Sequence, residues 1–202
     1  MRIGLLGGSF DPVHRGHVAG ALAVRERLGL ERVLFVPTAQ PPHKAGRRLA
    51  SALARYAMVE LALLDCPELA VWDVELAAGR PSYTIETLER FASERPGDEA
   101  VLILGSDSLG ALDTWRRWTE ILERTPLAIV ERPGAAREQV LAGLGAELAA
   151  RLARARVEWV TGAPHPASAS EIRRRLAAGE PVPEGWLDPR VLTFVHKYRL
   201  YR

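Results

Sequence analysis

The stretch "RIGLLGGSFDPVHRGH", residues 2–17, decides the fold. It opens with a short apolar run that ends in two glycines, which is the pattern of a buried strand followed by a tight turn. From His17 to Leu30 apolar residues recur at helical spacing, and Gly29 ends the pattern. The stretch therefore predicts a strand, a glycine turn and a helix in direct succession.

The rest of the chain repeats this alternation. Short apolar runs predict strands at residues 2–8, 32–37, 69–76, 100–105, 127–132 and 157–162. Helical periodicity predicts helices at 17–30, 49–64, 83–94 and about 135–155, and two more near the carboxyl end. Alternating strands and helices form parallel βαβ units, so we expect an α/β fold with a doubly wound, Rossmann-like parallel sheet flanked by helices. We expect one domain over residues 1–202, with 165–202 as its small helical C-terminal part, and ligands at the carboxyl ends of the strands.

Composition narrows the function classes. Apolar residues make up 48% of the 202 residues, and 27 basic against 25 acidic side chains give a formal charge of +2. This balance gives no global field that calls for nucleic acid or an anionic membrane as a partner. Cys66 is the single cysteine, and neither a signal-peptide layout nor a membrane-length apolar run is present, so a cytoplasmic location is expected. The sequence leaves open whether copies of the chain form a homo-oligomer.

The opening stretch has the residue types of a phosphate site. Gly7 and Gly8 let the backbone turn and let an anion approach main-chain N–H groups. His14 and His17, three residues apart at a helix entrance, place two imidazole donors on one side of a turn. Two alternatives stay open: the histidines cap the helix without a ligand, or they bind a metal together with His43.

Six motifs together resemble one protein family. They are GGSFDPVHRGH at 7–17, PPHK at 41–44, SYTIETL at 82–88, GSDSL at 105–109, ERPG at 131–134 and SASEIRRR at 168–175. In this order and approximate spacing they resemble bacterial nicotinate mononucleotide adenylyltransferase, of the nucleotidyltransferase superfamily, from residue 3 to the end of the chain. The resemblance implies transfer of AMP from ATP to nicotinate mononucleotide by direct in-line attack, which yields nicotinate adenine dinucleotide and pyrophosphate. It implies Mg²⁺ on the triphosphate and no protein nucleophile.

The resemblance also implies the site residues. It assigns catalysis to His14, His17, Lys44 and Arg173. It assigns ATP binding to Gly7, Gly8, Ser9, Phe10, His14, His17, Gly105, Asp107, Ser168, Ser170 and Arg173. It assigns the mononucleotide to His43, Lys44, Ser82, Tyr83, Thr84, Trp115 and Arg132. No residue is assigned as a resident metal ligand, and the Mg²⁺ of ATP is expected near Asp107.

Several of these residues have a plain structural interpretation as well. Asp107 suits a helix cap, Lys44 suits a solvated surface charge, and Trp115 or Trp118 suits core packing. Ala169 stands where the family motif has a hydroxyl, which removes one donor from the late motif.

Other functions remain to be weighed against the adenylyltransferase. One is a metal-dependent phosphohydrolase, which needs more Asp or His at strand ends than this chain offers. Another is a non-catalytic nucleotide-binding module, which needs the glycine turn but not both histidines. Nicotinamide mononucleotide is the alternative substrate, because a sequence does not show the backbone geometry that distinguishes an acid from an amide.

Overall fold

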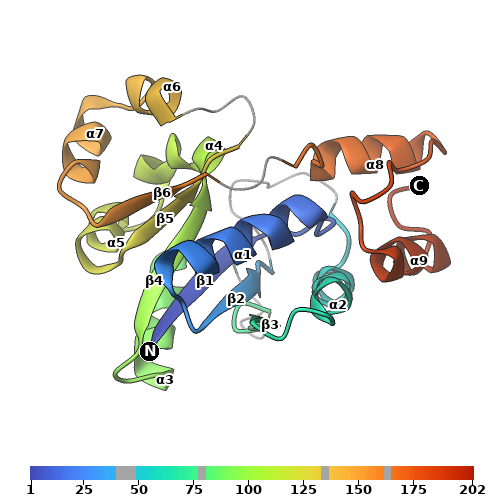
Figure 1. The fold of residues 1–202 in the computed structure, drawn as a ribbon, viewed down its shortest axis with the longest axis horizontal. Coiled ribbons are helices and arrows are strands. Elements are labelled where there is room, and N and C mark those ends of the chain that lie inside the picture. The colour runs from blue at the N-terminus through green and yellow to red at the C-terminus, as the bar shows by residue number, and fades with distance from the viewer. Residues whose placement is uncertain (40–48, 77–80, 133–136, 162–164) are drawn as a thin grey trace.

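The structure, a computed structural model, describes residues 1–39, 49–76, 81–132, 137–161 and 165–202 (Figure 1). Its strands are β1 (Arg2–Gly8), β2 (Arg32–Pro37), β3 (Leu69–Val71), β4 (Glu99–Gly105), β5 (Leu127–Val130) and β6 (Val157–Val160). Its helices are α1 (Arg15–Leu28), α2 (Ala52–Leu63), α3 (Thr84–Glu94), α4 (Ser106–Leu109), α5 (Trp118–Arg124), α6 (Arg137–Ala142), α7 (Ala146–Leu152), α8 (Ala169–Ala177) and α9 (Pro189–Lys197), with the 3₁₀ turn η2 (Leu112–Thr114).

The strands form one parallel sheet in the order β3-β2-β1-β4-β5-β6. The chain winds outward from β1 in one direction and, after β3, crosses back to β4 and winds in the other. The strand order therefore reverses between β1 and β4, which is where such sheets bind ligands at the carboxyl ends of their strands. The predicted doubly wound α/β fold is confirmed.

Two apolar layers cover the two faces of the sheet. One face packs against α1, α2, α8 and α9, and the other packs against α3, α5 and α7. Successive residues of a strand point to opposite faces, so Ile3 and Leu5 of β1 are buried in the second layer while Leu6 packs against the first. Both faces are covered, which explains why the strands read as continuous apolar runs rather than alternating ones.

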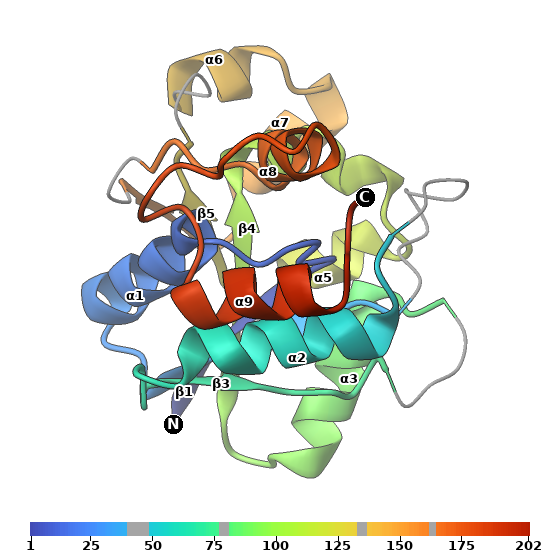
Figure 2. The same ribbon diagram turned by 90° about the vertical axis from the view of Figure 1, so that its right-hand side faces the viewer.

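The carboxyl-terminal helices return to the first face. Helix α9 lies alongside α2 (Figure 2). Helix α8 lies on the other side of α9 from α2, near the carboxyl ends of the strands. Ile172 of α8 and Val191 of α9 are fully buried in the same layer as α1 and α2. The end of the chain is thereby brought back to the start of α1.

Two predicted elements differ from the structure. The predicted strand 69–76 ends at Val71, because the chain turns where the Leu76 N–H bonds the Asp73 carbonyl at 2.8 Å. The predicted helix 135–155 is two helices, α6 and α7, since Gly143 ends the first and Gly145 caps the second, and glycine is a poor residue for a helix interior.

None of the helices in the described parts of the chain has both the length and the apolar character that a membrane span requires.

Candidate active site

The two histidines of the opening stretch meet at the start of α1. His14 is the residue before the helix, and its N–H donates to His17 Nδ1 at 3.2 Å. The two ring centroids lie 3.8 Å apart. Because the first N–H groups of a helix carry the positive end of its dipole, both imidazoles stand where an anion is stabilised.

Phe10 lies behind this pair rather than beside the cavity. Its side chain is buried, its φ is +45°, and its ring edge meets the His17 ring with centroids 5.2 Å apart. A Cβ on Gly8 would lie 3.0 Å from the Phe10 ring, so a side chain here would require the ring to shift. The Phe10 side chain therefore packs in the core against His17, and the predicted contact of this position with ATP stays a prediction.

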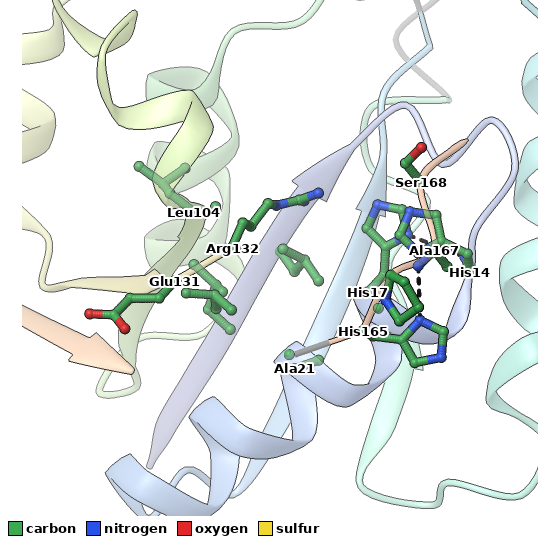
Figure 3. Close-up of a pocket in the computed structure, with 16 residues that line it drawn as sticks. His14, His17, Ala21, Leu104, Glu131, Arg132, His165, Ala167 and Ser168 are labelled. Carbon is green, nitrogen blue, oxygen red and sulfur yellow. Dashed lines mark hydrogen bonds between the residues drawn. The ribbon is translucent and has the colours of Figure 1, made fainter. Parts of the chain in front are cut away.

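A cavity of about 250 Å³ opens between the start of α1, the ends of β4 and β5, and the chain that leads into α8 (Figure 3). Its apolar wall includes Leu6, Ala21, Ile103, Val130 and Ala167. Its polar side carries His14, His17, Arg132, His165 and Ser168. One cavity thus combines a surface suited to a flat base with donors suited to phosphates.

His14 is held in its neutral form. The residue is 4% exposed, and burial, followed by the nearby charges of Arg132 and His165, lowers its pKa to about 3. At neutral pH the imidazole is therefore a hydrogen-bond donor without a charge of its own.

This pKa predicts a pH dependence of stability. An unfolded histidine has a pKa near 6.5, so between pH 6.5 and about 3 the unfolded chain binds the extra proton. The contribution of neutral His14 is complete above pH 6.5 and is lost as the pH falls toward 3. Urea unfolding of the nucleotide-free protein at pH 7 and pH 4.5 should show wild type losing about 2 to 3 kcal/mol more than His14→Gln. His196→Gln, on an exposed part of α9, is the control; equal losses in wild type and His14→Gln would contradict the prediction.

His165 is a cavity residue that the sequence analysis missed. Its Nδ1 accepts the Ala167 N–H at 3.2 Å, so in the neutral ring the proton sits on Nε2. The signal in the sequence is its position, three residues before Ser168 of the late motif, but a lone histidine between prolines carries no pattern.

Gly105, Asp107 and Arg132 meet at the end of β4. Arg132 Nε lies 3.1 Å from Asp107 Oδ1, and the Arg132 N–H donates to Ser106 Oγ at 3.1 Å. A Cβ on Gly105 would meet the ends of the Asp107 and Arg132 side chains, which would have to shift to make room for it. Asp107 lies in the first turn of α4 as an ion-pair partner and does not cap it. Arg132, predicted to contact the mononucleotide, lines the same cavity as the ATP candidates.

The late motif reaches back to the glycine turn. Ser168 caps α8 by accepting the Glu171 N–H at 3.2 Å. Arg173 Nη1 donates to the Asp11 carbonyl at 2.6 Å, and its Nη2 donates to Ser170 Oγ at 3.2 Å. Arg174, by contrast, pairs with the surface glutamates Glu171 and Glu180 of its own segment.

Asp11 ties the glycine turn to the end of the chain. Its carboxylate is 1% exposed, and Oδ1 accepts the Ala50 N–H at 3.1 Å and the Tyr201 hydroxyl at 2.8 Å. Burial and the Asp11 charge raise the pKa of Tyr201, so the phenol stays protonated as the donor. No local pattern in the sequence could reveal this contact.

The residues predicted to hold the pyridine ring form a second group. Tyr83 precedes α3, Thr84 begins it, and Ser82 lies just before them. The Arg116 guanidinium lies 4.9 Å from the Tyr83 ring centroid, which brings the segment after Trp115 alongside the start of α3. Trp115 and Trp118 are both half-buried against the second apolar layer, so core packing accounts for part of each ring.

Three polar side chains connect this second group to the glycine turn. Thr87, in the first turns of α3, donates to Glu75 Oε1 at 2.7 Å. The hydroxyl of Thr38 is also within hydrogen-bonding reach of Glu75 and lies 3.3 Å from the Gly8 carbonyl. Burial raises the pKa of Glu75. These three residues come from separate motifs and loops, so no single motif in the sequence predicts that they meet.

Two assignments fall outside what the structure describes. His43 and Lys44 lie within residues 40–48, so their predicted roles and the alternative metal site of His14, His17 and His43 are not tested. Within the described ranges, no group of three or more His, Cys, Asp or Glu side chains gathers in a metal-binding arrangement.

Comparison with known proteins identifies the family. The cytidylyltransferase-like family model matches residues 5–175. A probable nicotinate-nucleotide adenylyltransferase of Symbiobacterium thermophilum is 41% identical over 99% of this chain and 95% of its own, and one of Solibacter usitatus is 40% identical over the full length of both. The nicotinic acid mononucleotide adenylyltransferase of Plasmodium falciparum, solved with NaAD, superposes with a TM-score of 0.79 at 18% identity, covering 99% of this chain and 97% of its own. The chain belongs to the nicotinate-nucleotide adenylyltransferase family of cytidylyltransferase-like proteins.

Proposed function

We propose that this protein transfers AMP from ATP to nicotinate mononucleotide, giving nicotinate adenine dinucleotide and pyrophosphate. The observation that carries the proposal is the pair His14 and His17, whose rings lie 3.8 Å apart at the start of α1, beside a cavity at the β1–β4 reversal. The names of relatives about 40% identical over the whole chain support the same reaction.

ATP fits the cavity with its base toward the apolar wall and its phosphates toward the polar side. Leu6, Ile103 and Val130 offer flat contact to an adenine ring. The start of α1 and the side chains of His17 and Arg132 offer donors to the phosphates.

The reaction needs alignment and charge neutralisation rather than a protein nucleophile. A phosphate oxygen of the mononucleotide forms the new bond to the α-phosphorus of ATP, and the bond from that phosphorus to the bridging oxygen of pyrophosphate breaks. Negative charge grows on the departing pyrophosphate. His14 and His17 are placed to donate to it, and Arg132 adds a fixed positive charge. A bound polyanion also opposes the effect of Arg132 and His165 on the pKa of His14.

Mg²⁺ fits this site as part of the nucleotide. Mg²⁺ prefers octahedral oxygen ligands and is often held by one or two carboxylates together with substrate phosphates. Asp107 supplies one half-exposed carboxylate at the end of β4, already paired with Arg132. Asp107 is therefore the residue that would hold the ion. When bound, Mg²⁺ would neutralise part of the negative charge of the triphosphate.

The start of α3 suits the carboxylate of nicotinate. Tyr83 and Thr84 lie where the first N–H groups of this 11-residue helix have no partner within it. A pyridine carboxylate would gain from these donors and from the helix dipole, whereas a neutral amide gains less. We infer that the acid is the preferred substrate.

Initial rates with the purified protein test the proposal. ATP with nicotinate mononucleotide should give nicotinate adenine dinucleotide and pyrophosphate in equal amounts, detected by chromatography and a coupled pyrophosphate assay. We expect kcat/KM for nicotinate mononucleotide to exceed that for nicotinamide mononucleotide by at least about tenfold, and EDTA to abolish product without lowering Tm in the absence of ATP. Release of inorganic phosphate from ATP without dinucleotide would favour a phosphohydrolase instead.

A further inference from the structure

Arg55 of α2 is a buried cation that the proposed reaction does not yet use. Its side chain is 1% exposed, and it is among the largest fully buried side chains in the described part of the molecule. Burying a guanidinium is costly unless its donors are satisfied. Its contacts therefore show what the fold gains from it.

The guanidinium holds three separate pieces of backbone. Nη1 donates to the Ser9 carbonyl at 2.6 Å, Nη2 donates to the Ala39 carbonyl at 3.0 Å, and Nε donates to the Ala50 carbonyl at 3.1 Å. Ser9 lies in the glycine turn, Ala39 follows β2, and Ala50 precedes α2. The shortest of the three bonds is the one to the glycine turn.

A bond to the Ser9 carbonyl fixes more than one oxygen. In a planar trans peptide the C=O and the following N–H point in opposite directions. Holding the Ser9 carbonyl toward Arg55 therefore turns the Phe10 N–H away from Arg55 and sets the conformation of Phe10, whose φ is +45°. The Phe10 ring in turn meets the His17 ring.

Asp11 reinforces the same arrangement from the other side. Its Oδ1 accepts the Ala50 N–H, so Ala50 is bonded through its carbonyl to Arg55 and through its N–H to Asp11. Burial lowers the pKa of Arg55 and the Asp11 charge raises it; a guanidinium in a protein stays charged. Arg55 and Asp11 thus both bond Ala50, and together this cation and this anion hold the turn that leads to His17.

We propose that Arg55 is a positioning residue for adenylyl transfer: it fixes the Ser9–Phe10 peptide, and through Phe10 it fixes the ring of His17. The inference rests on the proposed function. Lysine at this position keeps the charge but cannot direct donors to three carbonyls in a plane, so Arg55→Lys is a demanding test.

The experiment compares wild type, Arg55→Lys, His17→Ala and the double variant at 20 °C, with Arg90→Lys on the exposed face of α3 as the matched control. Tm is measured for each, and kcat and KM are measured with ATP and nicotinate mononucleotide. We expect Arg55→Lys to lower kcat about 10- to 100-fold while KM for the mononucleotide stays within about threefold. In the His17→Ala background the same substitution should lower kcat less than about threefold, because both changes act on one ring.

Two results would overturn the inference in a protein whose wild type and Arg90→Lys variant are active. One is a lowered Tm with wild-type kcat, which means that Arg55 serves stability alone. The other is independent effects that multiply in the double variant. If Arg55→Lys does not fold, Arg55→Gln replaces it, because glutamine does not bury an ammonium group. The same comparisons of Tm, kcat and KM then test the inference. An inactive wild type would instead overturn the proposed function, and the inference with it.

Discussion

His17→Ala is expected to leave the fold intact and to lower kcat about 100- to 1,000-fold, the loss of about 3 to 4 kcal/mol of transition-state stabilisation. His17 Nδ1 accepts the His14 N–H, so the proton of the neutral ring sits on Nε2. The hydrogen bond from His17 Nε2 to a phosphate oxygen becomes stronger as negative charge grows on the phosphates. Alanine has no such donor. Steady-state kinetics with ATP and nicotinate mononucleotide measure the effect.

Two further variants separate chemistry from helix capping. His17→Asn keeps an acceptor near the position of Nδ1, so it should recover most of the stability that alanine loses at the start of α1 while kcat stays low. His196→Ala, near the exposed end of α9, should change neither property. A His17→Ala enzyme with near wild-type kcat would remove His17 from the mechanism.

The elements nearest the opening stretch were the most predictable. The strand is a short apolar run that ends in two glycines, and the helix has apolar residues at helical spacing up to Gly29. Residues 2–30 alone therefore predict both β1 and α1. Strand β3 was predicted too long because Trp72 and Val74 keep a strand-like composition although the strand ends at Val71 and the chain turns at residues 73–76. In that turn Glu75 is buried and accepts the Thr87 hydroxyl, a tertiary contact that no local pattern in the sequence shows.

The candidate site likewise has one part that the sequence predicts and one part that it does not. His14 and His17 could be placed together from their spacing, because three residues are about one turn of a helix. The contacts that hold them could not be predicted. Arg173 and Tyr201 reach Asp11 across 162 and 190 residues, and neither periodicity nor a short motif encodes a partner so far away in sequence.

Tertiary packing also decides how particular residues act. Arginine side chains mostly lie at protein surfaces, yet Arg55 of α2 is buried on backbone carbonyls. Phe10 belongs to the motif but lies in the core. A motif therefore shows which segment forms the site, while packing decides which of its side chains face the ligand.

Arg173→Ala should cause the second large loss, about 100-fold in kcat/KM for ATP. The side chain is 17% exposed and lies 3.8 Å from the Asp11 carboxylate as well as on the Asp11 carbonyl, so its removal leaves a buried anion without this cation and frees the turn. The free energy of unfolding should fall by about 1 to 3 kcal/mol in addition.

Arg174→Ala is the matched control for Arg173→Ala. This neighbour differs by one helix position and pairs with Glu171 and Glu180 at the surface, with its own side chain 52% exposed. Exposed pairs contribute little, so activity should stay within about twofold and stability within about 0.5 kcal/mol. Equal losses in the two variants would show that charge on α8, rather than the bond to the glycine turn, matters. Because one arginine faces Asp11 and the next faces water, the difference between the two variants measures what the Arg173 side chain contributes to catalysis.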